Sequence, residues 1–385
     1  MTDLDWFSHT ATIPPAARQK VAGHLAGYVR TVRDQARRHL GEHASVCVSG
    51  SLARGEPALR RTGTDYRLGS DADLVAICDG HDELGQVERF TRAVLAAHPD
   101  IDSTVFTVAR QDLGRVTGRF GADLHHAAAR PLAGPIPVGL ANSRIGLREG
   151  MEGLTHQLAR IYCPDHPPGA SPWQTKTALE ALRALTCSGG QPRGPQRYSS
   201  LITDRRASAV LGSAEVAALV GAREQSHPMP LAPAHTYELV LTAAAHLFGT
   251  AATHPALLTG LHTVPAGIHL LDGFQRAILA ATFILYGPPR FRCAAAAALH
   301  VTLTAIDRDT VPTALADLDA LAAISPSEFG RCTGHPDRVL RARLQRLRAD
   351  YYHHLGPHNF GACPVTTYTG PTSTASSTGS THRHG

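Results

Sequence analysis

The pattern of apolar and polar positions divides this chain into two regions. In the N-terminal region, apolar residues recur at helical spacing over residues 15–40 and 83–98. Short runs rich in β-branched residues at 45–49, 73–77 and 101–108 predict three strands. A strand, a helix and a strand in close succession are typical of a compact α/β unit.

The C-terminal region begins near residue 150, where helical patterns alternate with breaks rich in Gly and Pro. Helices are expected over residues 151–162, 174–187, 235–248, 271–286, 290–306 and 336–354. Residues 363–385 are rich in Ser, Thr and Gly, which predicts a disordered tail. The predicted fold class is α+β, with a small mixed sheet and flanking helices followed by an all-helical C-terminal region. We expect domains at residues 1–145, 146–250 and 251–362, with the tail at 363–385.

Composition narrows the class of protein. An apolar content of 43% and a charged content of 18% are those of a globular protein, and no apolar run approaches the roughly 20 residues that span a bilayer. The N-terminus lacks the apolar stretch of a secretory signal, and the seven cysteines lack CxxC spacing, which indicates reduced thiols and a cytoplasmic location without membrane contact. The net charge is only +5 and no aromatic and basic platform is evident, so a nucleic-acid partner is possible but not favoured.

Two aspartates are the first candidate for chemistry. Asp73 begins the strand predicted at 73–77 and Asp71 lies two residues before it; residues i and i+2 of an extended strand point to the same face, so the two carboxylates would lie side by side. Two adjacent carboxylates repel each other unless a cation lies between them, and magnesium is commonly held by one or two carboxylates together with phosphate oxygens. The alternative is that one aspartate caps a turn while the other faces solvent.

A Gly-Ser pair earlier in the chain strengthens the first interpretation. Gly50 follows a predicted strand and permits a tight turn, after which helix amides and the Ser51 hydroxyl can meet an anion. Arg54 lies one turn further on, where it can pair with the same phosphates or with an acidic neighbour. Strand, Gly-Ser, helix, strand and Asp-x-Asp in this order form a specific pattern.

These residues resemble the signature of the polymerase-β-like nucleotidyltransferase superfamily, and GSLARG before SDADLV is particularly similar to the minimal and aminoglycoside nucleotidyltransferases. The resemblance covers roughly residues 45–108. It implies that Ser51 contacts the triphosphate and that Asp71 and Asp73 bind two magnesium ions. It also implies a third carboxylate on the next strand, for which Asp102 is favoured and Asp100 competes.

The spacer between Ser51 and Asp71 is longer than is usual in the family, and we expect a surface loop or small hairpin there. Residues 130–134 resemble the turn that often closes the catalytic domain. In this superfamily a helical partner domain commonly lends a lysine to the triphosphate, and Lys176, one of only two lysines in the chain, opens a predicted helix.

Two other groups of residues are weaker candidates. A histidine and cysteine cluster near the C-terminus matches no zinc spacing and is interpreted as a solvated helix end; it comprises His353, His354, His358 and Cys363. Residues 119–125 fit the R-x-H spacing of ribonuclease partners of minimal nucleotidyltransferases, which we interpret as chance because they fall inside the expected catalytic domain.

The sequence hypothesis is therefore a magnesium-dependent nucleotidyltransferase that moves a nucleoside monophosphate from a triphosphate, with ATP the expected donor, to a hydroxyl of a small acceptor. The catalytic and metal-binding residues would be Asp71, Asp73 and Asp102, with Asp102 accepting the proton of the acceptor hydroxyl. The nucleotide-binding residues would be Gly50, Ser51, Arg54 and Lys176. Alternatives are a toxin that nucleotidylates tRNA or protein, a synthase of nucleotide signals, and a non-catalytic nucleotide-binding protein that retains the fold.

Overall fold

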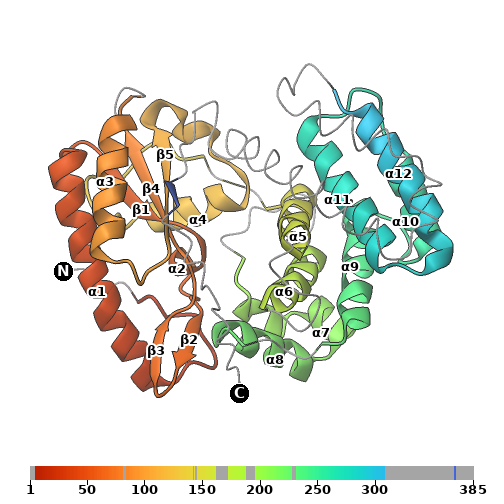
Figure 1. Ribbon diagram of the computed structural model, residues 1–385, viewed down its shortest axis with the longest axis horizontal. Coiled ribbons are helices and arrows are strands. Elements are labelled where there is room, and N and C mark those ends of the chain that lie inside the picture. The colour runs from red at the N-terminus through yellow and green to blue at the C-terminus, as the bar shows by residue number, and fades with distance from the viewer. Residues whose placement is uncertain are drawn as a thin grey trace, which may run out of the picture.

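The computed structural model shows an α/β region and a helical region side by side (Figure 1). The residues that it describes are 5–80, 84–141, 143, 145–161, 172–187, 196–227, 231–307 and 368–369. The mixed α+β class expected from the sequence is confirmed at this level, with a small sheet and many helices.

The main sheet has the strand order β1-β4-β5-β6. Its strands are β1 (Ser45–Val48), β4 (Ala72–Cys78), β5 (Ser103–Ala109) and β6 (Tyr368–Thr369). β1 runs antiparallel to β4, whereas β4 and β5 are parallel and are joined through helix α3 (Leu84–Ala97). The three strands expected from the sequence are confirmed, although β5 begins at Ser103, so that Asp102 precedes the strand rather than lying within it.

Helices cover both faces of this sheet. α1 (Pro15–His39) and α3 lie side by side on one face, where Val21, Leu25 and Phe90 are fully buried against β4 (Figure 1). On the other face, α4 (Gly118–Ala128) packs on Val75 and Ile77. α1 and α3 match the helical periodicity of the sequence, but α4 was not predicted.

The long spacer between Ser51 and Asp71 forms a β-hairpin, which confirms the sequence expectation. β2 (Leu59–Thr62) pairs antiparallel with β3 (Asp65–Leu68) across a two-residue turn. The hairpin packs against α1, and Lys20 of that helix pairs with Asp65 at 2.7 Å. The extra residues therefore extend away from the Gly-Ser turn.

The helical region contains eight α-helices among its described residues: α5 (Leu147–Ile161), α6 (Pro172–Thr186), α7 (Arg205–Leu211), α8 (Ser213–Glu224), α9 (Pro233–Phe248), α10 (His254–His262), α11 (Leu270–Tyr286) and α12 (Arg292–Ala305). The helical region also has the short 3-10 helices η3 (Ser199–Thr203) and η4 (Pro289–Phe291), whereas η2 (Arg110–Arg115) lies between β5 and α4 in the α/β region. Five expected helices are confirmed as α5, α6, α9, α11 and α12, whereas α7, α8 and α10 were not predicted.

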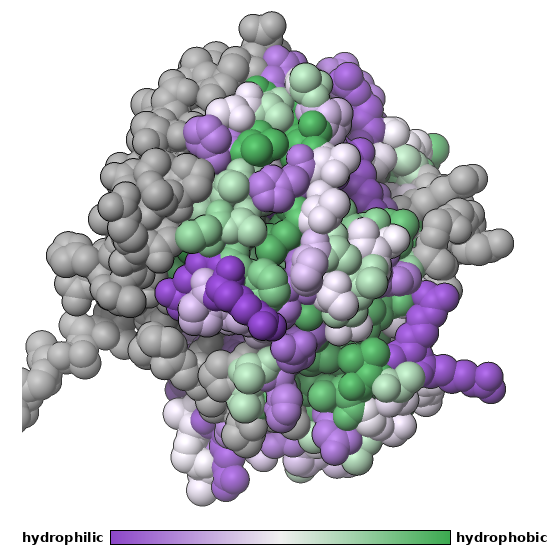
Figure 2. Space-filling model, turned by 90° about the vertical axis from the view of Figure 1, so that its right-hand side faces the viewer, coloured by the Kyte–Doolittle hydropathy of each residue, from purple (hydrophilic) through white to green (hydrophobic). Residues whose placement is uncertain are grey.

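A continuous apolar core extends from Leu154 to Ile306 and joins these helices. The domain boundary expected at residue 250 falls inside that shared core. On the side of the helical region shown in Figure 2, apolar side chains reach the surface between polar ones. Along the described ranges, no helix combines the length and apolar content required to cross a bilayer.

Most of the predictions for the C-terminal part of the chain concern residues that lie outside the described ranges. These include the helix at 336–354 and the cluster of His353, His354, His358 and Cys363. Within the expected disordered tail, however, Tyr368 and Thr369 pair with β5 at the edge of the sheet. For these two residues the prediction of disorder is wrong, because strand pairing supplies backbone hydrogen bonds that composition does not encode.

Candidate active site

The candidate carboxylates gather where β4 and β5 begin. The parallel register places Asp73 beside Thr104, and Ala72 donates its amide hydrogen to the Asp102 carbonyl at 2.7 Å. Asp73 lies within β4, whereas Asp71 immediately precedes β4 and Asp102 immediately precedes β5, so the three residues lie at the same edge of the sheet. Asp71 and Asp73 are half-buried and Asp102 is exposed, so all three can be reached from solvent.

The Gly-Ser turn lies directly against the second aspartate. Gly50 adopts φ +64°, and a Cβ atom at this position would lie 2.4 Å from Oδ2 of Asp73. The Ser49 amide also donates to the Asp73 carbonyl at 2.7 Å. Position 50 therefore requires glycine for two reasons: the backbone is left-handed, and the Asp73 carboxylate occupies the space that a side chain would need. Two sequence motifs separated by the hairpin thus meet in space.

Ser51 lies next to this contact in the chain. It belongs to α2 (Gly50–Ala53), a single turn of helix, and is only 8% exposed. Its carbonyl accepts a hydrogen bond from the Glu56 amide at 3.0 Å, which fixes the backbone after the turn.

The carboxylate set suits a hard cation. Gly50 leaves room for the Asp73 carboxylate, and oxygen donors are the ligands that magnesium prefers. Asp71, Asp73 and Asp102 do not all approach within 4.8 Å of one another; in the described part of the chain, the group that does so is His24, His98 and Asp100. Magnesium needs only one or two protein carboxylates when phosphates supply further oxygens, so Asp71 and Asp73 would hold it with Asp102 nearby.

Asp100, the competitor for the third position, has a different partner. Its Oδ2 atom lies 2.9 Å from Nε2 of His24 on α1. α1 covers the face of the sheet opposite to Asp73, so this contact directs Asp100 away from the other two carboxylates. The geometry favours Asp102.

Arg54 pairs with acidic neighbours, which was one of its two expected roles. Its guanidinium contacts Glu56 at 2.8 Å and Asp123 of α4 at 2.5 Å. Burial by itself would lower the pKa of Arg54, but the carboxylates of Asp123 and Glu56 outweigh burial and raise it, so the side chain stays charged. Arg54 thereby fastens the segment after Ser51 to α4.

A buried charge cluster joins the α/β region to the helical region. We call it the interface charge cluster; its members are Arg54, Glu56, Arg119 and Asp123 from the α/β region and Glu180, Arg183, Tyr198 and Arg223 from the helical region. It contains one more guanidinium than carboxylates.

Glu180 is the centre of this cluster. Its carboxylate pairs with Arg119, with Arg183 at 2.8 Å and with the Tyr198 hydroxyl, which donates at 2.5 Å. Burial alone would raise the pKa of Glu180, but Arg119 and Arg183 reverse the effect and lower it. Burial and the Glu180 charge raise the pKa of Tyr198 to about 12, so the hydroxyl keeps its proton.

Glu56 completes the link between the two regions. One of its carboxylate oxygens accepts from the Tyr198 amide at 2.7 Å, and its backbone carbonyl accepts from Arg223. These contacts hold the segment after the Gly-Ser turn against η3 and α8. Nε and Nη2 of Arg119 and Nε of Arg183 are buried and have no hydrogen-bond partner among the described residues.

The sequence did not single out most of this cluster. Arg119 fell in a spacing interpreted as chance, and nothing local distinguished Glu56 or Glu180. Arg119 and Glu180 are 61 residues apart, so only the tertiary structure brings their side chains together. The one usable signal, which the sequence analysis did not use, is that Glu180 and Arg183 stand as opposite charges three residues apart in an Ala/Leu-rich helix.

Lys176 lies on α6, in the helical region. It is half-buried on α6, one turn before Glu180. Residues i, i+4 and i+7 of a helix share a face, so Lys176 lies on the same face as Glu180 and Arg183. Through Glu180 and Arg119 this face adjoins the α/β region.

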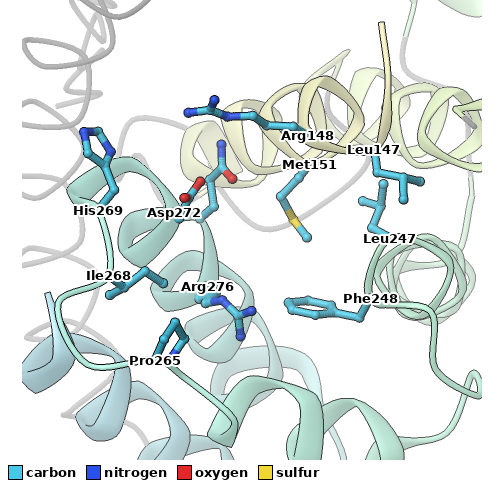
Figure 3. A pocket seen from close by; sticks show the side chains of 11 residues that line it. Leu147, Arg148, Met151, Leu247, Phe248, Pro265, Ile268, His269, Asp272 and Arg276 are labelled. Carbon is cyan, nitrogen blue, oxygen red and sulfur yellow. The ribbon is translucent and has the colours of Figure 1, made fainter. Parts of the chain in front are cut away.

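A hollow away from these residues lies between α5, α9 and α11 (Figure 3). Its volume is about 550 Å³, and Met151, Leu247 and Phe248 form an apolar wall opposite Asp272 and Arg276. Arg276 lies 4.9 Å above the Phe248 ring and donates to the Gly260 carbonyl at 3.0 Å. None of the candidate catalytic residues lines this hollow, so it is a separate site.

The candidate active site thus comprises the Gly-Ser turn, Asp71 and Asp73 at the start of β4, and Asp102 immediately before β5, and the interface charge cluster fixes the segment that follows the turn. Comparison with protein families, curated proteins and solved structures finds no match to this chain.

Proposed function

We propose that the protein is a magnesium-dependent nucleotidyltransferase that moves a nucleoside monophosphate from a nucleoside triphosphate to a hydroxyl of a small acceptor, releasing pyrophosphate. The observation that carries the proposal is the contact of Gly50 with the Asp73 carboxylate. It unites the Gly-Ser turn with the Asp-x-Asp pair, and it explains why glycine stands at that position.

Each carboxylate has a separate task in this proposal. Asp71 and Asp73 hold magnesium, which when bound screens the phosphate charges and polarises the α-phosphate. Asp102 is exposed at the start of β5 and accepts the proton of the acceptor hydroxyl. The oxygen then attacks phosphorus while the bond to pyrophosphate breaks.

Cationic and hydroxyl groups stabilise the triphosphate. Ser51 donates from the turn, and Lys176 approaches from the α6 face that adjoins the α/β region. Arg54 acts indirectly, since its guanidinium is bound to Glu56 and Asp123 and positions the backbone behind Ser51. The extra guanidinium of the interface charge cluster adds positive potential behind the turn.

The test is pyrophosphate release from ATP, GTP, CTP and UTP with magnesium, first without acceptor and then with aminoglycosides, nucleosides and bulk tRNA. Asp71→Asn and Asp73→Asn are expected to lose at least about 100-fold in rate, because metal polarisation contributes several kcal/mol and each 1.36 kcal/mol is tenfold. Asp79→Asn is the matched control, since Asp79 follows the other end of β4 and pairs with Arg110.

The outcomes separate the alternatives. The proposal is supported if pyrophosphate release requires a small hydroxylated compound and is lost in both Asp71→Asn and Asp73→Asn. Release with nucleotide alone indicates signal synthesis or self-modification, and release triggered by tRNA identifies a nucleic-acid acceptor. Nucleotide binding without any release by the wild type overturns the proposal in favour of a non-catalytic protein.

A further inference from the structure

Two histidines and an aspartate converge on the face of the sheet opposite to the candidate active site. His24 comes from α1, His98 follows the last turn of α3, and Asp100 lies in the turn before β5. One ligand atom from each lies within 4.8 Å of the other two. Residues from three separate segments therefore present two imidazoles and a carboxylate to one point.

The three side chains are held by their neighbours. His24 Nε2 lies 2.9 Å from Oδ2 of Asp100, and His98 Nε2 lies 2.9 Å from the Thr31 hydroxyl. The His98 ring also packs edge-on against Tyr28, with ring centroids 5.3 Å apart. These two contacts fix the orientation of the His98 ring, and a hydrogen bond to the second ring nitrogen orients metal-ligating histidines in the same way.

Space for a further ligand lies beside the group. A pocket of about 270 Å³ is lined by His24 and Asp100, together with Lys20, Asp65 and Arg67. Lys20 and Arg67 oppose a cation there, but Lys20 is neutralised by Asp65 at 2.7 Å. A water molecule can enter from this pocket to complete a coordination shell.

We propose that His24, His98 and Asp100 form a binding site for a zinc-class transition-metal ion, with water as the fourth ligand. Two nitrogens and one carboxylate oxygen match the donor set of three-ligand zinc sites, whereas magnesium and calcium prefer oxygen alone. The bound ion ties α1 to the turn between α3 and β5, two residues before Asp102. The site does not depend on the proposed nucleotidyl transfer.

The test titrates Co²⁺ and then Zn²⁺ into the full-length protein after chelator treatment, following the visible absorption of bound Co²⁺ and the binding stoichiometry. Wild type is expected to bind one ion at this site, and Zn²⁺ is expected to displace Co²⁺ while Mg²⁺ in excess does not. His24→Ala and Asp100→Asn should each weaken this binding by at least the roughly 10–100-fold that loss of an outer-shell partner costs.

Matched variants exclude other sources of binding. His39→Ala removes a histidine from the same helix and should change nothing, and His353→Ala/His354→Ala should leave the Co²⁺ absorption of this site intact. Both His24 and Asp100 are exposed, so their substitution leaves the core packed. Unaltered Co²⁺ binding in folded His24→Ala and Asp100→Asn, or loss of binding only in the His353→Ala/His354→Ala variant, would overturn the proposal, whatever the result of the pyrophosphate assay.

Discussion

The α/β region and the helical region place their charged side chains differently. In the α/β region the apolar core is divided by the sheet, and carboxylates emerge where β4 and β5 begin. The helical region has a single apolar core from Leu154 to Ile306, and its buried charges are concentrated where it meets the α/β region. The strand ends therefore carry the carboxylates of the proposed active site, whereas the helical region contributes charged groups through the interface charge cluster.

The largest effect is expected from removing the Glu180 carboxylate, which Arg119 and Arg183 share at the interface between the two regions. Glu180→Ala leaves Arg119 and Arg183 buried without their main partner, so we expect the free energy of unfolding to fall by about 3–5 kcal/mol. Urea denaturation measures the loss.

Glu88→Ala is the control for that substitution. Glu88 forms an exposed pair with Arg92 on α3, which should contribute only about 0.3–0.5 kcal/mol. If both variants lost the same small amount, the interface charge cluster would not hold the two regions together.

A second substitution tests the contact on the sheet side. Gly50→Ala places a methyl group against the Asp73 carboxylate and strains a left-handed residue, so we expect a loss of roughly 2–3 kcal/mol in stability and a large loss of pyrophosphate release. Thermal unfolding and the release assay measure the two effects.

Gly63→Ala supplies the comparison. Gly63 has the same φ of +64°, but no atom lies within 4 Å of its added Cβ. Gly63→Ala should therefore lose only about 1–2 kcal/mol of stability, which comes from backbone strain, and its rate of pyrophosphate release should not change. Equal behaviour of the two variants would show that the Asp73 contact is unimportant.

Arg54→Lys distinguishes the two expected roles of that residue. Lysine cannot pair with Glu56 and Asp123 in the same forked geometry, so we expect about 1.5 kcal/mol less stability, and the KM for the triphosphate should rise only together with that loss of stability. A raised KM with unchanged stability would instead place the guanidinium on the phosphates.

The smallest expected effect concerns the two lysines. Lys176→Ala should raise the KM for the triphosphate about threefold to tenfold, an energy of about 1 kcal/mol, if α6 lends this charge to the site. Lys20→Ala should leave the KM unchanged, since Lys20 belongs to an exposed pair with Asp65. Steady-state kinetics of both variants measure the difference.

Local patterns were sufficient for most elements of the α/β region. Periodicity and residue type located α1, α3 and the strands β1, β4 and β5, and the Gly-Ser and Asp-x-Asp motifs marked residues that the fold brings together. α4 was missed because Gly118 and Gly121 weaken its helical signal, and α7 because it is only seven residues long.

By itself, the sequence determined which faces of the longer helices are apolar and which side chains share a strand face, because these follow from periods of 3.6 and 2 residues. Only the tertiary structure decided that Asp100 pairs with His24, that Arg54 binds Asp123 and that Glu180 binds Arg119. Each of these contacts joins residues far apart in the chain. Their partners depend on how helices and sheet pack, which no local pattern specifies.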